Sequence, residues 1–446
     1  MNTVTLWPAS GHYPIVPNHI AIDPTPKDQA IYVPSVTPGY ALDVYSQRNF
    51  GRKLPAGLQV ADLNFLDPAN RLFRISHAMS SAGQALNQGS PCIITTRDRK
   101  ETILICDSGG YQIASNRLRI NGNADVLRIL RWMEQHADYA MTLDVPTGPL
   151  LRPGYAYKTF GDCLDSTLDY LALFQRNRVP GAVKLLNVLQ GNTLQESDIW
   201  YHAVKGYDFE GWAFAGPLRH SMYLLSRRIL QMADEGQLQR KHWIHVLGTC
   251  ELDTAVLLTA LQRAINKHIN PNLRISFDTS TPFRMLSFNQ VYSIPTFNRA
   301  NLIAMPTRSA PNGLGFVGSS IRWPWPSPLG DRMVMGDFCV LKSSTASNYR
   351  DMQSYWYLAH HNLSALCWGV ALANRVFDSE IVTRQHTMAT DVGAGVEAIE
   401  KVIASGSMQT LQAHTTTFSR LRHKLVYDPT NSSGDEGERT FHDITP

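Results

Sequence analysis

Apolar runs that end on a polar residue or a glycine recur along the middle of this chain of 446 residues. They end at Asp107, Asp144, Gln190, Gly216, Gly248 and Asp278, so successive ends lie 37, 46, 26, 32 and 30 residues apart. Segments with the periodicity of amphipathic helices lie between them, as at Ala124–His136 and Asp253–Ile269. This alternation is typical of βαβ units in a parallel sheet.

The runs are almost continuously hydrophobic, as parallel strands buried on both faces are. Two more strands are expected at Ile31–Val36 and Gln59–Phe65, which brings the total to the eight that close a TIM barrel. We therefore predict an α/β fold, with a (β/α)8 TIM-type barrel over residues 1–320. The alternative, an open doubly wound sheet, usually carries a G-x-G-x-x-G loop after an early strand, and none occurs here.

The composition changes after Pro311, where residues 311–332 are rich in Gly, Pro, Ser and Trp. Such a segment predicts an irregular linker or an elaborated loop. Helical patterns follow at Gln353–Val376 and near Gly395–Ala404. We expect a mostly helical C-terminal subdomain over residues 321–425 and a flexible tail over 426–446.

Composition excludes several classes of protein. With 43% hydrophobic and 17% charged residues the chain is globular, and its net charge of +4 permits a polyanionic partner without requiring one. The six cysteines form no C-x-x-C pair, which favours reduced thiols. No signal-peptide pattern and no run long enough to cross a bilayer are visible. We expect a cytoplasmic protein without a membrane partner.

Acidic residues end three of the apolar runs. In a (β/α)8 barrel the active site lies at the carboxyl ends of the strands. Asp107, Asp144 and Asp278 are therefore expected on one rim, together with Gln190 and Gly216. Taken singly, an Asp after a strand is more often a helix cap and a Gly-Gly more often a turn. The joint placement of three acids and an amide is what indicates a binding site.

Such a rim suits a purine-like base. A carboxylate accepts hydrogen bonds from the N1–H and exocyclic amine of guanine, while an amide and a backbone N–H donate to its O6. A second carboxylate can attack a sugar carbon and form a covalent glycosyl-enzyme. A third can move the protons that departure and entry of a base require. This division of roles is similar to that in retaining glycosidases.

Six motifs, in the same order, resemble those of the tRNA-guanine transglycosylase superfamily. They are DSGGYQ (107–112), TLDVP (142–146), LQG (189–191), GWAFAGPL (211–218), HVLG (245–248) and SFDTSTPFR (276–284). The resemblance covers about residues 100 to 290. It implies base exchange in a nucleic acid by double displacement, without a cofactor.

The resemblance also implies the catalytic roles. Asp278 would be the nucleophile on the sugar C1′, and Asp107 the general acid and base. A second Pro-Thr-Arg at 306–308 permits another register, with Leu302 at the nucleophile position. Leucine cannot attack a sugar, and Asp278 ends a strand at the right interval, so we prefer Asp278.

The implied base site comprises Ser108, Tyr111, Asp144, Gln190, Gly216 and Leu247. Asp144 would read the N1–H and 2-amino edge, while Gln190 and the Gly216 N–H would read O6. Tyr111 and Leu247 would stack on the two faces of the ring, and Ser108 would lie beside it.

The zinc motif of the tRNA enzymes is degenerate here. Where that family has C-x-C-x-x-C and a His, this chain keeps Cys339 alone among the cysteines, and Lys342 cannot complete a zinc site of that type. His361 matches the family's zinc histidine but has lost its partners. We therefore expect no structural metal. The chain most resembles the zinc-less DpdA type of phages and bacterial islands, which inserts 7-deazaguanines into DNA.

The predicted partner is therefore DNA, with the host cytoplasm as the location if a phage encodes the chain. Weak phosphate contacts are expected from Arg284, Arg227, Arg228 and Arg240. The family's acid for an aminomethyl group is missing at 219–221, which favours the neutral 7-cyano-7-deazaguanine as the incoming base. A divergent tRNA enzyme and a non-catalytic partner subunit remain alternatives, as do a homodimer and accessory modification proteins. A barrel enzyme for a phosphorylated metabolite would need a glycine-rich phosphate site at the last two strands.

Overall fold

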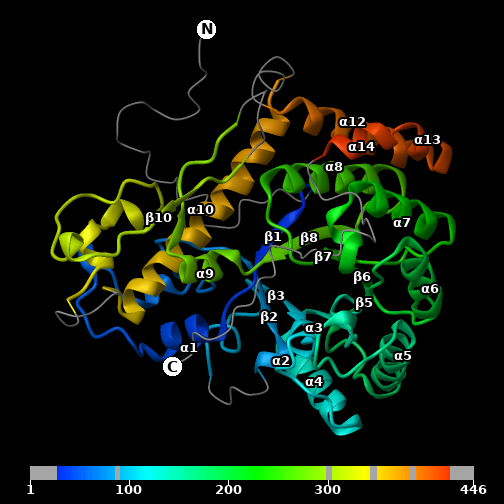
Figure 1. Ribbon diagram of the computed structural model, residues 1–446, viewed down its shortest axis with the longest axis horizontal. Coiled ribbons are helices and arrows are strands. Elements are labelled where there is room, and N and C mark those ends of the chain that lie inside the picture. The colour runs from blue at the N-terminus through cyan, green and yellow to red at the C-terminus, as the bar shows by residue number, and fades with distance from the viewer. Residues whose placement is uncertain (1–27, 86–90, 298–303, 342–348, 381–387, 422–446) are drawn as a thin grey trace.

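Eight parallel strands form a nearly closed barrel at the centre of the molecule (Figure 1). The computed structural model describes residues 28–85, 91–297, 304–341, 349–380 and 388–421. The strand order is β1-β8-β7-β6-β5-β4-β3-β2. The two ends of this sheet meet where Ser35 bridges Met79 and the Val36 N–H donates to the Met79 carbonyl at 2.9 Å. The predicted (β/α)8 barrel with a C-terminal helical region is confirmed.

The barrel strands are short. They are β1 (Ile31–Pro34), β2 (His77–Ser81), β3 (Ile103–Asp107), β4 (Tyr139–Met141), β5 (Lys184–Leu189), β6 (Gly211–Phe214), β7 (Trp243–Val246) and β8 (Arg274–Thr279). The helices that precede or connect them are α1 (Pro38–Ser46), α2 (Ala82–Ala85), α3 (Gly110–Ala114), α4 (Asn123–His136), α5 (Phe160–Asn177), α6 (Leu194–Val204), α7 (Met222–Asp234) and α8 (Leu252–His268).

The chain continues beyond β8 into α9 (Thr281–Arg284) and an antiparallel pair, β9 (Gln290–Tyr292) with β10 (Thr307–Ser309). The C-terminal helices are α10 (Met352–Asp378), α12 (Thr390–Ser405), α13 (Met408–Ala413) and α14 (Thr415–Arg420). The helices expected near 124, 253 and 353 are confirmed, and the one near 395 begins earlier, at Thr390. The tail expected over 426–446 lies outside the described residues.

One expected strand is wrong. Gln59–Phe65 is not part of the barrel, because it forms a 3-10 turn over Val60–Leu63. Asp62 accepts a hydrogen bond from the Gln59 N–H at 2.7 Å, and such local bonds compete with a strand ladder. The missing strand is β2, which pairs in parallel with β3 from His77↔Ile103 to Ser81↔Asp107.

The hydrophobic core has two layers. The inner cluster fills the barrel and consists of Ile31, Val33, Met79, Ile105, Tyr139, Met141, Leu186, Val188, Ala213, Ala215 and Trp243. These residues alternate along their strands, as inward-facing barrel residues do. The outer cluster lies between strands and helices and also takes in buried residues of α10 and α12. The C-terminal helices are therefore part of the same core as the barrel.

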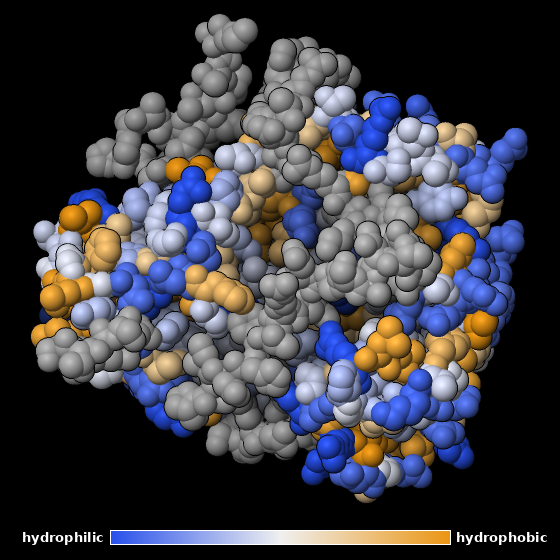
Figure 2. Space-filling view, in the orientation of Figure 1, coloured by the Kyte–Doolittle hydropathy of each residue, from blue (hydrophilic) through white to orange (hydrophobic). Residues whose placement is uncertain are grey.

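Exposed hydrophobic residues lie among hydrophilic ones on both sides of the view. Figure 2 shows hydrophobic patches between hydrophilic residues on the right-hand side, where α4 to α7 surround the barrel. Hydrophobic atoms gather at the left, where the segment after β10 lies. Exposed side chains of that segment include Leu314, Phe316 and Ile321. Among the described residues, no helix has the length and apolarity needed to cross a bilayer.

Gly211 offers a direct test of the barrel packing. Its position on β6 is opposite Leu186 and Trp243, and an added Cβ would lie 2.2 Å from the Trp243 carbonyl oxygen. A backbone atom cannot move aside, so Gly211→Ala should lower the free energy of unfolding by about 2–3 kcal/mol. Urea unfolding measures this. Gly206→Ala is the matched control, since its Cβ would meet nothing within 4 Å. Equal stability of the two variants would contradict this packing.

Candidate active site

The residues predicted for the site lie at the carboxyl ends of the barrel strands. Asp107 is the last residue of β3, Asp278 is the last but one of β8, and Gln190 directly follows β5. Asp144 and Gly216 follow β4 and β6 by two or three residues. The strands are parallel, so all five positions share one rim of the barrel.

Asp144 and Gln190 form a direct pair. The Gln190 side-chain amide donates to Asp144 Oδ2 at 2.8 Å, and both side chains are buried. Gly216 lies against them with a positive φ of 60°, and a Cβ there would be 3.6 Å from Gln190 Oε1. An amide carries two N–H donors, so one remains for a bound molecule. The three residues therefore place hydrogen-bond donors and an acceptor side by side at the rim.

The two glycines of the DSGG segment have separate structural reasons. Gly109 precedes α3 with a φ of 109°, a left-handed conformation that favours glycine. Gly110 lies against the Asp144 carboxyl, since a Cβ there would be 3.3 Å from Asp144 Oδ1. The glycines therefore bring the start of α3 close to the Asp144 carboxyl group.

Burial raises the pKa of the Asp107 and Asp144 carboxyl groups. The pKa of Asp144 rises to about 7, chiefly because burial removes water, while the Gln190 hydrogen bond lowers it and the Asp107 charge raises it. The pKa of Asp107 rises to about 6, again chiefly through burial, with Asp278 raising it and the Gly109 N–H lowering it. A group that titrates near neutral pH is suited to general acid and base catalysis.

Asp278 has two hydrogen-bond partners on one oxygen. Its Oδ1 accepts from the Gly248 N–H at 2.8 Å and lies 3.2 Å from His245 Nε2. The other oxygen, Oδ2, has no hydrogen-bond partner among the described residues. Asp278 is 6% exposed, so this carboxylate is buried but reachable from the rim.

The other residues predicted for a base site also lie at the rim. Tyr111 is in α3 and 44% exposed, so its ring is accessible for stacking. Leu247 follows β7 and packs against the inner cluster. Ser108 is fully buried, and its hydroxyl has no hydrogen-bond partner among the described residues. An unpaired polar atom at a rim is what a bound polar ligand would satisfy.

Arg219 extends the site on the side of Asp278. Its guanidinium lies about 4 Å from the position of a Cβ at Gly248, the residue whose N–H holds Asp278. Arg219 Nε also donates to His220 Nε2 at 2.8 Å. The sequence predicts a missing acid and a nearby arginine at 219–221, and the structure brings the Arg219 guanidinium to the edge of the site.

Three of the four expected phosphate contacts need correction. Arg228 is fully buried and pairs with Asp198 at 2.6 Å, and Arg227 forms two bonds to the same carboxylate at 2.8 and 2.9 Å. Both arginines of α7 therefore form ion pairs with Asp198 of α6, in the layer of helices outside the barrel. Arg240 precedes β7 and so lies at the opposite, amino end of the barrel. Arg284, at the end of α9 after β8, remains on the rim side.

The side chains expected to be remnants of a zinc site have protein partners. His361 Nδ1 lies 2.7 Å from Ser327 Oγ, and its Nε2 lies 3.0 Å from the Tyr292 carbonyl. Cys339 Sγ donates to the Pro311 carbonyl at 3.4 Å. Among the described residues no group of three or more His, Cys, Asp or Glu could hold a metal ion.

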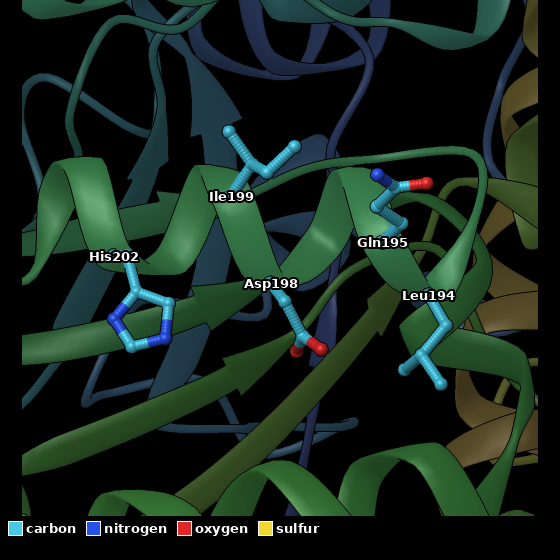
Figure 3. A pocket seen from close by; sticks show the side chains of 5 residues that line it. All are labelled: Leu194, Gln195, Asp198, Ile199 and His202. Carbon is cyan, nitrogen blue, oxygen red and sulfur yellow. The ribbon is translucent and has the colours of Figure 1, made fainter.

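A surface hollow elsewhere contains none of the predicted residues. It is lined by Leu194, Gln195, Asp198, Ile199 and His202, all from α6 (Figure 3). Asp198 in this hollow is already paired with Arg227 and Arg228. The rim is therefore the candidate active site.

No family model and no curated protein matches this chain. The assignment of a function therefore depends on the rim residues and their geometry.

Sequence reasoning missed His245, Ser276 and Trp243, which form a buried polar network with Asp278. A signal for them was present. Trp243 and His245 are two residues apart on one strand, as are Ser276 and Asp278 on the next. In a barrel this spacing brings side chains to the same, inner face.

The raised pKa of Asp144 predicts a stabilising substitution. The folded state binds its proton more tightly than the unfolded state, so stability falls as pH rises from about 4 to about 7. Asp144→Asn removes this loss and can still accept from Gln190. It should raise the free energy of unfolding by about 2–4 kcal/mol at pH 8 and by less at pH 5. Urea unfolding of the ligand-free protein at both pH values measures it.

Asp162→Asn is the control of opposite sign. Asp162 accepts from the Lys158 and Thr159 N–H groups at the start of α5, and these bonds lower its pKa. Its substitution should reduce stability at pH 8. A loss of stability in Asp144→Asn at pH 8 would contradict the cost assigned to this buried carboxylate.

Proposed function

We propose that this protein is a DNA-guanine transglycosylase, which exchanges guanine in DNA for a 7-deazaguanine through a covalent Asp278 intermediate. The observation that carries the proposal is the rim itself. The buried Asp144–Gln190 pair offers an acceptor and a donor that are complementary to the edge of a guanine. It lies on the same rim as two further carboxyl groups. A site that only bound a base would not need the two additional acids.

Each carboxyl group has an environment that fits its proposed role. Asp144 and Gln190 read the base through their paired side chains. Asp107, with its pKa near 6, delivers a proton to the leaving guanine and takes one from the incoming base. Asp278 has one oxygen held by two donors and one unpaired among the described residues, as a nucleophile requires.

Double displacement then proceeds in balanced steps. Asp278 forms a bond to C1′ as the bond from C1′ to guanine breaks, and the electron pair of that bond leaves with the base. The incoming 7-deazaguanine attacks C1′ from the vacated site, and the carboxylate of Asp278 departs. The proton that Asp107 gave to the first base is replaced by that of the second.

Charge at the rim supports a neutral substituent on the incoming base. The aminomethyl group is cationic at neutral pH, and the Arg219 guanidinium next to Gly248 would repel it. The nitrile of 7-cyano-7-deazaguanine carries no charge and can accept a hydrogen bond. We therefore propose 7-cyano-7-deazaguanine as the incoming base.

Cys339 and His361 are hydrogen-bonded to other residues of the protein. The tRNA enzymes use these two positions to bind zinc, so this difference supports DNA over tRNA as the acceptor. A non-catalytic subunit is the second candidate. It would not need a carboxyl group with a pKa near neutral beside the base-reading pair, and Asp107 is such a group.

The nucleophile is tested by base exchange. Purified protein is incubated with radiolabelled guanine and either DNA or tRNA, and incorporation is counted. The parent should label DNA, while Asp278→Ala should lose activity by at least about 10⁴-fold, as nucleophile removal does in other enzymes. Asp331→Ala, outside the rim, is the control. Near-parental turnover by Asp278→Ala would rule out this assignment.

The acceptor and the incoming base are tested in competition. 7-Cyano- and 7-aminomethyl-7-deazaguanine are offered together with DNA and tRNA, and the nucleosides are then identified by mass spectrometry. We expect the cyano base in DNA, with single-stranded DNA reacting faster because flipping a base out of a duplex costs a few kcal/mol. Arg219→Glu should shift the preference toward the aminomethyl base. Modification of tRNA alone would return the tRNA enzyme to favour.

A further inference from the structure

Four polar side chains along β7 and β8 form a hydrogen-bonded network in the mostly apolar barrel interior. Trp243 Nε1 donates to Ser276 Oγ at 2.6 Å. Ser276 Oγ lies 2.7 Å from His245 Nδ1, and His245 Nε2 lies 3.2 Å from Asp278 Oδ1. His245 and Ser276 are fully buried. The network therefore leads from the barrel interior to the carboxylate at the rim.

The donor and acceptor of each hydrogen bond in this network can be assigned one after another, starting from Trp243. An indole N–H can only donate, so Ser276 Oγ accepts from Trp243. The single hydroxyl proton of Ser276 is then free to point at His245 Nδ1, which makes Nδ1 an acceptor. A neutral imidazole with an acceptor at Nδ1 carries its proton on Nε2. His245 Nε2–H therefore donates to Asp278 Oδ1, which the opposite tautomer would face with a lone pair.

Both donors to Asp278 act on the same oxygen. The Gly248 N–H and His245 Nε2 converge on Oδ1 from β7 and the loop that follows it. Oδ2 is left without a partner among the described residues. A carboxylate held in this way has one orientation and one free oxygen.

We infer that His245 is a positioning residue for the nucleophile, with its tautomer set by Trp243 and Ser276, so that Oδ2 of Asp278 attacks the sugar C1′. This inference rests on the proposed function. In the glycosyl-enzyme the new bond joins C1′ to Oδ2, and Oδ1 becomes the ester carbonyl oxygen. When the incoming base attacks C1′, the electron pair returns to the carboxylate, and the donors on Oδ1 stabilise the charge as it forms.

The composition of the barrel interior supports a functional reason for this network. Alternating inward positions on the other strands carry apolar side chains such as Val33, Met141 and Val188. Burying a serine and a histidine there costs free energy that apolar side chains would not. The hydrogen bonds offset that cost only if the network is complete.

Kinetics of matched variants test the positioning role. His245→Leu removes the donor and should lower kcat on the order of 10–100-fold, as loss of an orienting partner does elsewhere. KM for the base should not change, because His245 contacts Asp278 and not the base-reading pair. His245→Gln can place an amide N–H toward Oδ1 and should recover most of kcat. Parental kcat in His245→Leu would overturn the inference.

Ser276→Ala removes the hydroxyl that bonds to His245 Nδ1 and leaves the Asp278 and His245 side chains themselves unchanged, so it tests what sets the tautomer of His245. It should lower kcat while leaving KM for the base unchanged. Ser226→Ala is the matched control, because Ser226 is also fully buried and its hydroxyl has no partner among the described residues. Equal losses of kcat and of thermal stability in His245→Gln and His245→Leu would show a merely structural role and would also overturn the inference.

The tautomer has its own signature, which does not depend on activity. Two-bond ¹H–¹⁵N spectra of protein with ¹⁵N-labelled histidine report which ring nitrogen carries the proton, and His245→Gln assigns the signal. We expect the proton of His245 on Nε2 in the parent, and a loss of this preference in Ser276→Ala. A proton on Nδ1 would overturn the inference even in an active enzyme. If the parent failed to exchange guanine while showing the Nε2 proton, the proposed function would fall and the hydrogen-bond order would stand.

Discussion

Three carboxyl groups lie on one rim of the barrel, largely shielded from water. The hydrogen bonds that each carboxyl group accepts, and the extent of its burial, determine the chemistry of the site. The cost of burying the Asp278 carboxylate is offset by its hydrogen bonds to the Gly248 N–H and to His245. Asp144 accepts a hydrogen bond from the Gln190 amide, and burial still raises its pKa to about 7. For Asp107 and Asp144 the effect of burial outweighs these hydrogen bonds, so both groups titrate closer to neutral pH than an ordinary carboxyl group.

Such a site lowers the stability of the protein that contains it. Every pKa raised by burial means that the ligand-free folded state is strained at neutral pH relative to the unfolded chain. A guanine edge would relieve this strain at Asp144 by donating to its carboxylate. The barrel can bear the cost because it has two apolar core layers, of which the outer one extends into α10 and α12.

The fold and the rim could be predicted from the sequence because each apolar run ends on the residue that faces the site. Asp107, Gln190 and Asp278 are found this way. The false strand at Gln59–Phe65 had the right hydrophobicity, but its side-chain bonds to the local backbone are not visible in a pattern. His245 was missed because a histidine inside a strand gives no sign of its partner, and only the pairing of β7 with β8 supplies Ser276. Arg228 was predicted to contact phosphate but is fully buried, because a charged residue in a sequence pattern does not show whether its side chain is exposed.

The central claim is that Asp278 carries the nucleic acid during exchange, and capture of the intermediate tests it most directly. An end-labelled DNA strand is mixed with the protein without free base, the mixture is denatured, and covalent complex is separated and digested for mass spectrometry. The account predicts label attached to the peptide that contains Asp278, released when a guanine is added before denaturation. Label attached to Asp107 or Asp144, or guanine exchange without any attached strand, would contradict it.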